Sequence, residues 1–314
     1  MNLLVSHKAQ IAGDIYLFEV RDANGAALPE FTPGAHVEVT GPTGLVRKYS
    51  LCSAPGETGY YRFAVKKEHH GQGGSRAMIE GVHTGDRLDV STPRNDFPLE
   101  ASAERFLFIA GGIGITPIYA MMQHLDARGV PYDLYYFART ASVTAFLNEV
   151  NAPREHSNIT VHHDEGDPSR AFDVAGLLAA REPGTHIYCC GPRPLMDAVR
   201  EAAANWPRGT VHFEDFGSAK VAEESNVNRP FRCHLAKSGV TLDIPADKSI
   251  VQVMREHGFD VPTSCETGSC ATCKTALIAG VADHRDLALF DDEQDTFIIP
   301  CVSRAKTQEI TIDR

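Results

Sequence analysis

Apolar and polar residues alternate over much of the first hundred positions, in short segments. A two-residue period of this kind is typical of strands that bury one face. We expect strands at residues 15–20, 36–40, 60–66 and 87–91. Turns rich in Gly, Pro and Asn separate them, such as Thr32-Pro33-Gly34. Short strands at this spacing predict a small β-barrel domain over residues 1–101.

The pattern then changes to apolar runs followed by helical periodicity. Residues 105–110 (RFLFIA) form a continuous apolar run, as expected of a buried parallel strand. Further strands are predicted at 132–137, 158–162 and 186–190, and helices at 118–128 and 194–204. Alternating strands and helices predict a parallel α/β domain over residues 102–216.

A polar segment without periodicity, 217–229, reads as a linker. The last domain is predicted at residues 230–314. Its expected strands are 231–235, 241–244 and 309–312, and its expected helix is 250–257.

Cysteine spacing carries the strongest chemical signal in the chain. Of eight cysteines, four follow the pattern Cys265-x4-Cys270-x2-Cys273, with Cys301 farther on. A [2Fe–2S] cluster needs four thiolates, and this spacing is the plant-type arrangement. Gly268 and its small neighbours suit a tight loop that directs N–H groups at sulfur. Four structural cysteines and a zinc site are the alternatives, although structural zinc usually takes two separate ligand pairs.

Composition narrows the classes of partner. The formal net charge is −11, and an acidic protein repels nucleic acid. We expect no membrane span, because no run of 18 uncharged apolar residues occurs, and no secretory signal at the N-terminus. These features predict a cytoplasmic protein. The histidines lack a consistent ligand spacing and read as ordinary surface or core residues.

Two segments of the first domain suit a flavin phosphate and ring. Arg47-Lys48-Tyr49-Ser50 places a cation, an aromatic ring and a hydroxyl in one extended stretch, although a plain strand would look the same. Gly73-Gly74-Ser75 enters a predicted helix, and a glycine-rich helix start offers free N–H groups to a phosphate.

Two turns of the second domain suit a nicotinamide nucleotide. Residues 110–117 (AGGIGITP) follow a strand and open a helix, but Pro117 excludes the G-x-G-x-x-G fingerprint, and a plain strand-to-helix turn is the alternative. Cys190-Gly191-Pro192 makes a second such turn. Arg139 is a candidate for the nucleotide phosphate or ribose, or a solvated strand-end residue. Asp164 suits a ribose 2′-hydroxyl and would repel a 2′-phosphate, which favours NADH over NADPH.

Taken together, the cysteine loop and the two preceding domains resemble the phthalate dioxygenase reductase family, which includes vanillate demethylase reductases. The likeness covers nearly the whole chain. It implies a ferredoxin-reductase-like β-barrel that binds FMN, a parallel α/β domain that binds NADH, and a C-terminal β-grasp ferredoxin domain. FMN rather than FAD rests on this resemblance alone.

The resemblance also implies roles for individual residues. On the phosphate side of the flavin it implies Arg47, Gly73, Gly74 and Ser75. On the ring side it implies Tyr49, Ser50, Ala64, Val65 and Lys66. The role of Lys48 stays open, with the phosphate as one possibility, because relatives often have small or apolar residues there. For the nicotinamide nucleotide it implies Gly112, Gly114, Ile115, Thr116, Pro117, Gly191, Pro192 and Met196. It brings Cys190 near the nicotinamide, with Cys189 in the core, and packs Phe216 by the flavin unless it is an ordinary core residue.

These sites together predict a relay from NADH through FMN and a [2Fe–2S] cluster to another protein. A flavin converts a two-electron donor into one-electron steps. The expected protein is the monomeric reductase component of a two-component Rieske oxygenase that hydroxylates aromatic rings or demethylates. A stand-alone reductase of small acceptors and a non-catalytic binding module are the alternatives. The acidic run 283–295 is a solvated loop or a docking patch for a basic oxygenase surface.

Overall fold

The computed structural model describes residues 1–69, 73–180, 182–216 and 228–314. Contacts within the chain divide it into two units, Met1–His212 and Phe213–Arg314, and each is described by itself. Most of the predicted linker 217–229 lies outside the described residues. None of the helices in the described ranges is both long and apolar enough to cross a membrane.

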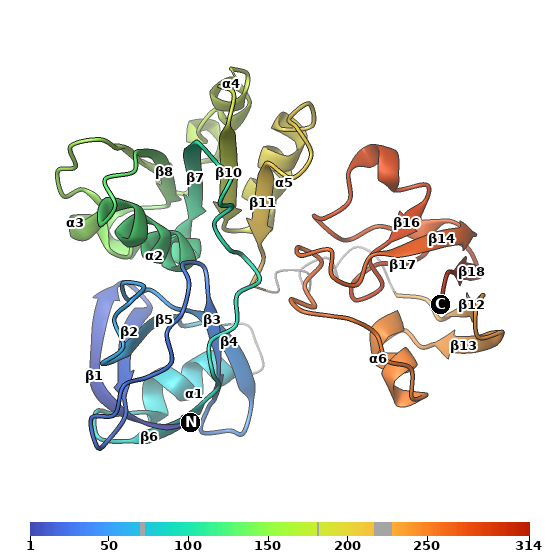
Figure 1. Cartoon of the computed structure of the whole chain (residues 1–314), viewed down its shortest axis with the longest axis horizontal. Helices are drawn as coiled ribbons and strands as arrows, with labels where there is room; N and C mark the ends of the chain where they lie inside the picture. Colours follow the sequence, from blue (N-terminus) through green and yellow to red (C-terminus); the bar gives the residue numbers. More distant parts are fainter. Residues whose placement is uncertain (70–72, 181, 217–227) are drawn as a thin grey trace. The chain divides into compact units, whose positions relative to one another are not determined.

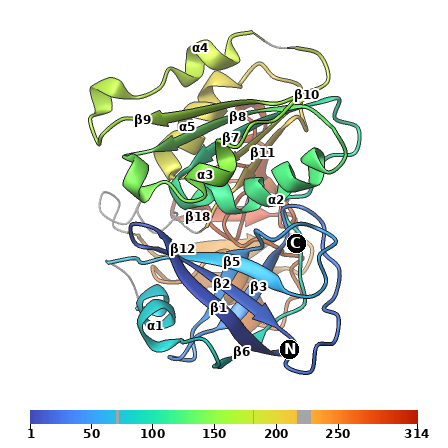
Figure 2. The ribbon, with the colours of Figure 1, turned by 90° about the vertical axis from the view of Figure 1, so that its left-hand side faces the viewer.

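An antiparallel sheet forms the N-terminal part of the first unit. Its strands are β1 (Asn2–Ala12), β2 (Ile15–Arg21), β3 (His36–Thr40), β4 (Val46–Ser50), β5 (Tyr61–Lys66) and β6 (Arg87–Val90). They are ordered β4-β3-β6-β1-β2-β5, and a bridge between Leu51 and Phe63 joins the two edges. The sheet therefore closes into the predicted barrel, and the helix α1 (Gly74–Gly81) lies beside it (Figure 2). Alternate strand residues fill its interior, among them Val5, Phe18 and Phe63.

A parallel sheet forms the rest of the first unit, and its last strand crosses the unit boundary after His212. Its strands are β7 (Arg105–Gly111), β8 (Tyr132–Ala138), β9 (Asn158–His163), β10 (Thr185–Cys190) and β11 (Val211–Glu214). Strands β10, β7, β8 and β9 pair in parallel in that order, and β11 follows β10 at the edge. The helices are α2 (Ile115–Asp126), α3 (Leu147–Val150), α4 (Val174–Leu178) and α5 (Arg193–Ala202), with short 3₁₀ turns η1 (Gly112–Gly114), η2 (Ala141–Val143) and η3 (Pro168–Arg170). Helix α2 covers one face and α5 the other (Figures 1 and 2).

The barrel and the parallel sheet share one apolar core within the first unit. Ile15, Cys52, Ala64 and Phe97 of the barrel part belong to the same buried cluster as the apolar residues of β7, α2 and β10. The side-chain amide of Gln123 on α2 donates to the carbonyl of Cys52 at 3.0 Å. Burial of this size fixes the two parts against each other, because separating them would expose apolar surface.

The second unit contains a mixed sheet packed on one helix. Its elements are β12 (Phe231–Leu235), β13 (Val240–Ile244), α6 (Ile250–Glu256), β14 (Thr275–Ala279), β15 (Ala282–Asp283), η5 (Asp291–Glu293), β16 (Phe297–Ile298), β17 (Arg304–Ala305) and β18 (Glu309–Ile312). The main sheet has the order β13-β12-β18-β14-β16, with β12 and β18 parallel. Ser249 caps α6 in a capping box with Gln252, which fixes where the helix begins. The cysteine loop runs between α6 and β14 (Figure 1).

Candidate functional site

Strand β4 carries four of the predicted flavin residues. The ring of Tyr49 stacks on Phe63, with centroids 5.2 Å apart and planes 15° apart, and burial raises the pKa of its hydroxyl to about 12. Ser50 is buried and pairs across the strands with His36. The barrel therefore holds Tyr49 in a fixed plane, which is what an aromatic neighbour of a flavin ring requires.

The glycine turn before α1 lies against Arg47. Gly73 has a left-handed backbone (φ 82°), which glycine adopts without strain, and it caps α1. A Cβ added to Gly74 would lie 3.5 Å from Arg47 Nε. The hydroxyl of Ser75 accepts from the backbone N–H of Glu68 at 2.9 Å. The structure thus brings together Arg47, Gly73, Gly74 and Ser75, the set predicted for a phosphate.

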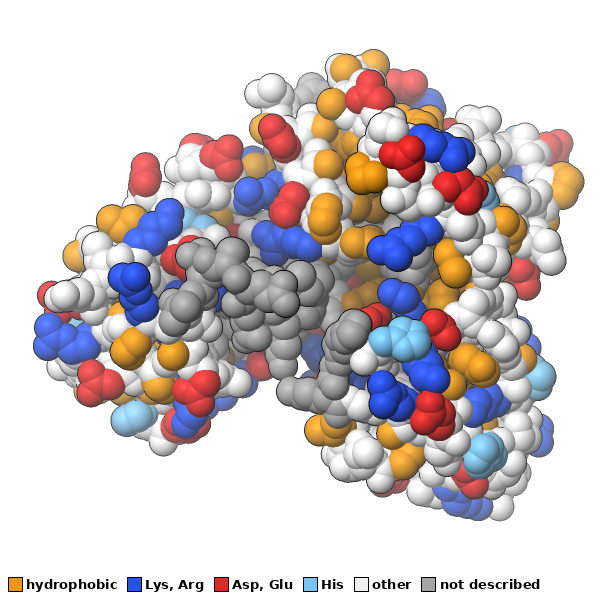
Figure 3. All heavy atoms as spheres, turned by 180° about the vertical axis from the view of Figure 1, so that it is seen from behind, with side chains coloured by type: hydrophobic (Ala, Val, Ile, Leu, Met, Phe, Trp, Pro, Cys, Tyr) orange, Lys and Arg blue, Asp and Glu red, His pale blue; other side chains and the backbone are white. Residues whose placement is uncertain are grey.

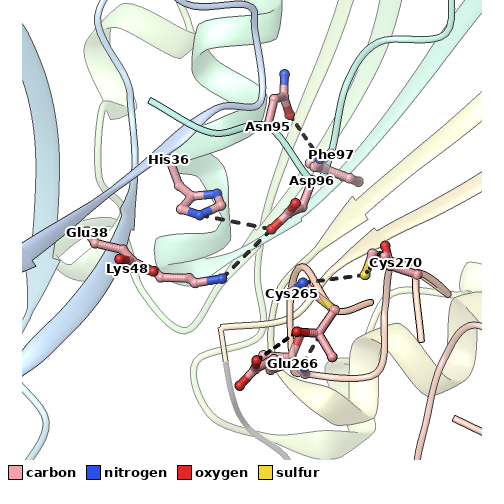
Figure 4. A network of polar contacts seen from close by, with 12 residues as sticks. His36, Glu38, Lys48, Asn95, Asp96, Phe97, Cys265, Glu266 and Cys270 are labelled. Atoms are coloured by element: carbon pink, nitrogen blue, oxygen red, sulfur yellow. Dashed lines mark hydrogen bonds and ion pairs between the residues drawn. The ribbon is translucent and has the colours of Figure 1, made fainter. Parts of the chain in front are cut away.

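Lys48 points away from that set. Its Nζ lies 3.8 Å from Asp96 Oδ2, and His36 Nε2 lies 4.0 Å from the same oxygen (Figure 4). Burial, followed by the charge of Lys48, lowers the pKa of His36. Neighbours on a strand face opposite ways, so the side chains of Arg47 and Lys48 leave β4 on opposite faces. Sequence reasoning missed His36 and Asp96, which lie far apart in the chain and carry no motif.

The end of β5 presents the other predicted flavin residues. Ala64 and Val65 are buried on opposite faces, Ala64 in the core shared with the parallel sheet and Val65 inside the barrel. Lys66 is exposed, and its Nζ lies 3.3 Å from Glu68 Oε1. Cations and carboxylates are mixed over the face of the molecule seen in Figure 3.

The two predicted nicotinamide turns pack against each other backbone to backbone. A Cβ added to Gly114 would lie 2.2 Å from the carbonyl oxygen of Cys190, and one added to Gly111 would lie 2.6 Å from Pro192 Cδ. Gly191 has equally little room, because its added Cβ would lie 2.9 Å from Gly111 Cα. Only glycine permits this approach at the carboxyl edge of the sheet, where α/β folds bind ligands. Gly111 was missed as a site residue, although the Gly-Gly pair was a visible signal.

The helices that follow these turns bury the remaining predicted residues. Ile115 and Thr116 are buried, as is Pro117 beside them, and the Thr116 hydroxyl donates to the carbonyl of Ile113 at 3.0 Å. Gly112 has a left-handed backbone (φ 54°), and its carbonyl accepts from the Tyr136 hydroxyl at 3.0 Å. Met196 on α5 is fully buried. Buried side chains and these hydrogen bonds therefore hold the first turn of α2 in place.

Both cysteines at the end of β10 are fully buried. Burial raises the pKa of the Cys189 thiol well above its usual range. Cys190 belongs to the buried cluster that contains the apolar residues of α2, and Cys189 does not, so the two thiols lie on opposite faces of the sheet.

Arg139 and Asp164 lie side by side beyond the ends of β8 and β9. The strands pair up to Ala138 and His163, and the N–H of Glu165 donates to the carbonyl of Arg139 at 2.8 Å. An Asp164 carboxylate oxygen accepts from the N–H of Gly166 at 2.8 Å, which fixes the turn. The predicted pair therefore meets at the same sheet edge as the glycine turns. Phe216, beyond β11, is 47% exposed and so is not a core residue of the unit that contains it.

In the second unit, the four cysteines of the motif meet as two pairs. Cys265 pairs with Cys270, and Cys273 with Cys301, each through a thiol–thiol hydrogen bond. That hydrogen bond lowers the pKa of Cys265 and Cys273 and raises the pKa of Cys270 and Cys301. In the described part of the chain, no three or more His, Cys, Asp or Glu side chains gather around a point suited to one metal ion. Two thiol pairs match the ligand need of two irons, each with two thiolates.

The loop around these thiols directs backbone N–H groups at sulfur. The N–H of Cys265 lies 3.4 Å from Cys270 Sγ (Figure 4). The N–H of Thr267 lies 3.4 Å from Cys265 Sγ. Glu266 and Ala271 have left-handed backbones, as does Gly268. A Cβ on Gly268 would lie 2.7 Å from Val302 Cγ2, so the loop is closely packed as well as tightly turned. Hydrogen bonds to sulfur are among the factors that set the reduction potential of such clusters.

Comparisons with known proteins agree with this arrangement. Three family models match the chain: an oxidoreductase FAD-binding domain over residues 2–98, an oxidoreductase NAD-binding domain over 108–201 and a 2Fe-2S iron-sulfur cluster binding domain over 233–306. The chain is therefore an oxidoreductase with flavin-, NAD- and [2Fe–2S]-binding domains, in the predicted order.

Relatives match over the full length. Phthalate dioxygenase reductase of Burkholderia cepacia is 46% identical over 100% of this chain and 97% of its own length. Vanillate O-demethylase oxidoreductase of Pseudomonas sp. strain HR199 is 39% identical over 100% and 99%. A solved phthalate dioxygenase reductase, described as a modular structure for electron transfer from pyridine nucleotides to [2Fe–2S], superposes with a TM-score of 0.71 at 45% identity and covers 100% and 98%. The chain belongs to the phthalate dioxygenase reductase family.

Proposed function

We propose that this protein is the reductase component of a two-component Rieske oxygenase that hydroxylates an aromatic ring or demethylates its substrate. Electrons pass from NADH through FMN and the [2Fe–2S] cluster to the oxygenase. The observation that carries this proposal is the match, over the full length, to reductase components of named oxygenases. A plant-type cluster has a reduction potential of about −400 mV and a Rieske centre one of about −150 mV or above, so the last electron transfer is downhill.

A bound flavin supplies the conversion between a two-electron donor and one-electron steps. Arg47 and the turn Gly73-Gly74-Ser75 bind its phosphate, through the guanidinium and the N–H groups that begin α1. Tyr49, held by Phe63, packs on the ring, and Ser50 and residues 64–66 line its edge. Lys48 has a different role, since its ammonium lies with Asp96.

The nicotinamide nucleotide binds across the paired glycine turns. Its phosphates approach the backbone at Gly112, where an added Cβ would meet nothing within 4 Å, and at the start of α2. Gly114, Gly191 and Pro192 hold the second turn, which opens α5, against the first. Asp164 accepts from a ribose 2′-hydroxyl, and its charge disfavours the 2′-phosphate of NADPH. Arg139 beside it binds phosphate or ribose. Cys190 lies near the nicotinamide, and Phe216 packs by the flavin.

Cys265, Cys270, Cys273 and Cys301 would ligate the cluster, which would supply a one-electron carrier. The pairing of the thiols and the N–H groups directed at sulfur support this assignment. The domain bounds 1–101, 102–216 and 230–314, a monomeric state and a cytoplasmic location belong to the same proposal. The absence of a disulfide among the eight cysteines, all of which lie in the described residues, fits a reducing compartment.

Anaerobic stopped-flow mixing with NADH tests the relay. We expect flavin absorbance to bleach first and cluster absorbance to follow, with a rhombic EPR signal at the end. Cys301→Ser should keep the first phase and lose the second, whereas Cys233→Ala, a buried cysteine of the same unit outside the loop, should keep both. Flavin reduction without cluster reduction in the parent protein would favour a stand-alone reductase. Mass spectrometry of the released flavin checks FMN against FAD.

A further inference from the structure

Asp286 is a buried carboxylate next to the cysteine loop. It is 2% exposed, and both of its oxygens accept hydrogen bonds. The N–H of Leu289 donates to Oδ2 at 2.8 Å, and the hydroxyl of Ser303 donates to Oδ1 at 3.1 Å. The imidazole Nδ1 of His284 lies 3.6 Å from Oδ1, beyond hydrogen-bond length. Burying a charged carboxylate costs free energy. If the residue only filled space, a neutral side chain would be more stable there.

Asp286 contacts both segments that carry the cysteines. Gly268, between Cys265 and Cys270, packs on it so closely that an added Cβ would lie 3.1 Å from Asp286 Cα. The N–H of Leu287 donates to the carbonyl of Gly268 at 3.0 Å. Ser303, two residues after Cys301, donates its hydroxyl hydrogen bond to Asp286 Oδ1. The chain at Asp286 therefore contacts the loop through its backbone and the segment of the fourth cysteine through its carboxylate.

We propose that Asp286 is a positioning residue for the [2Fe–2S] cluster, and that its buried negative charge holds the reduction potential of the cluster low. This rests on the proposed function, in which the four cysteines ligate the cluster. Reduction adds one negative charge to the cluster, and a fixed carboxylate nearby disfavours that charge. The surrounding protein screens the repulsion less than water would. A low potential matters because it sets the driving force for transfer to the acceptor protein.

Redox titration of the intact protein, followed by EPR, tests the proposal. Asp286→Asn keeps the shape of the side chain and removes its charge. We expect the equilibrium constant for one-electron reduction of the cluster to rise about tenfold, a positive shift of about 59 mV. Asp295→Asn, which removes an exposed acid from the same unit, should leave the potential unchanged.

A second variant separates charge from packing. Ser303→Ala keeps the carboxylate but removes a donor to it, so the field at the cluster becomes more negative and the potential should fall. Loosening the loop would admit water and move the potential upward in both variants. The proposal is overturned if Asp286→Asn leaves the potential unchanged, or if Ser303→Ala raises the potential or leaves it unchanged. If the Asp286→Asn variant does not assemble a cluster, the measurement on Ser303→Ala alone decides. Absence of any cluster signal in the parent protein would instead refute the proposed function.

Discussion

Gly114 shows at the scale of one residue how little freedom the nicotinamide turns have. Its backbone is right-handed, so alanine is conformationally acceptable there, yet the added Cβ would meet the Cys190 carbonyl oxygen at 2.2 Å. Because the obstacle is backbone, Gly114→Ala must push β10 and α2 apart. We expect a loss of roughly 1–3 kcal/mol of stability, typical of overpacking, and a raised KM for NADH. Urea unfolding and steady-state kinetics measure both.

Gly81→Ala is the matched control for that substitution. Gly81 also has a right-handed backbone and ends α1, but its added Cβ would meet Pro42 at an ordinary 3.6 Å. It should keep the parent KM and unfold at the same or a higher urea concentration, since alanine favours helix. If Gly114→Ala behaved like Gly81→Ala, the close packing of the two turns would be wrong.

At the scale of the element, β10 and β11 are joined by a stack of rings. His212 lies on Tyr188 with centroids 4.4 Å apart, and its Nε2 lies 3.0 Å from His186 Nδ1. Burial, and then the neighbouring His186, lowers the pKa of His212 from 6.5 to about 4. The folded state therefore favours the neutral ring. Its contribution to stability is complete above about pH 6.5 and is lost as the pH falls toward about 4.

We expect this histidine to make acid unfolding steeper. For a fully buried ring, this pKa shift would correspond to about 3 kcal/mol of unfolding free energy. Solvent screening of the partly exposed ring reduces the expected loss of stability to about 1–2 kcal/mol between about pH 7 and pH 4.5. His212→Phe keeps a ring on Tyr188 and removes the titrating group, so its urea midpoint should fall less over that interval. An equal fall in parent and variant would show that other groups cause the loss.

Strand and helix patterns in the sequence predicted most elements of the fold, and the exceptions have physical causes. Strands β3, β12 and β18 have the predicted bounds, since each alternates cleanly over a buried core. Strand β1 was missed because polar side chains interrupt its pattern, and its pairing with β2 shifts register after Val5 and again after Gln10. The short strands β15 and β17 hold two residues each, too few for a period to be visible.

The candidate site, too, could be predicted from the sequence only in part. Motifs within one segment, such as the cysteine loop, were readable because spacing along the chain sets their geometry. Contacts between distant segments were not readable. Nothing in the strand β4 indicates that Lys48 meets Asp96, and nothing near Gly268 indicates that Asp286 lies against it.

At the scale of the whole molecule, the net charge of −11 bears on how the protein meets its acceptor. The proposed oxygenase would be attracted if its docking surface is basic, and salt would then slow the encounter. Asp291 and Asp292 of η5 are the acidic positions of interest because both are exposed, whereas Glu293 beside them is only partly exposed. We expect the double substitution Asp291→Lys/Asp292→Lys to lower the rate of oxygenase reduction at low salt and to flatten its salt dependence.

A control with the same change in net charge distinguishes a local patch from the overall field. Glu30→Lys/Glu155→Lys reverses two exposed acids on the first unit and alters the total charge equally. If η5 is the docking patch, only the first double variant flattens the salt dependence, because screened charges act over about 10 Å. If both variants flatten it alike, steering comes from the net charge, and if neither does, the acidic run is a solvated loop. Reduction by NADH should be unchanged throughout, since these carboxylates lie outside the residues proposed to bind NADH or flavin.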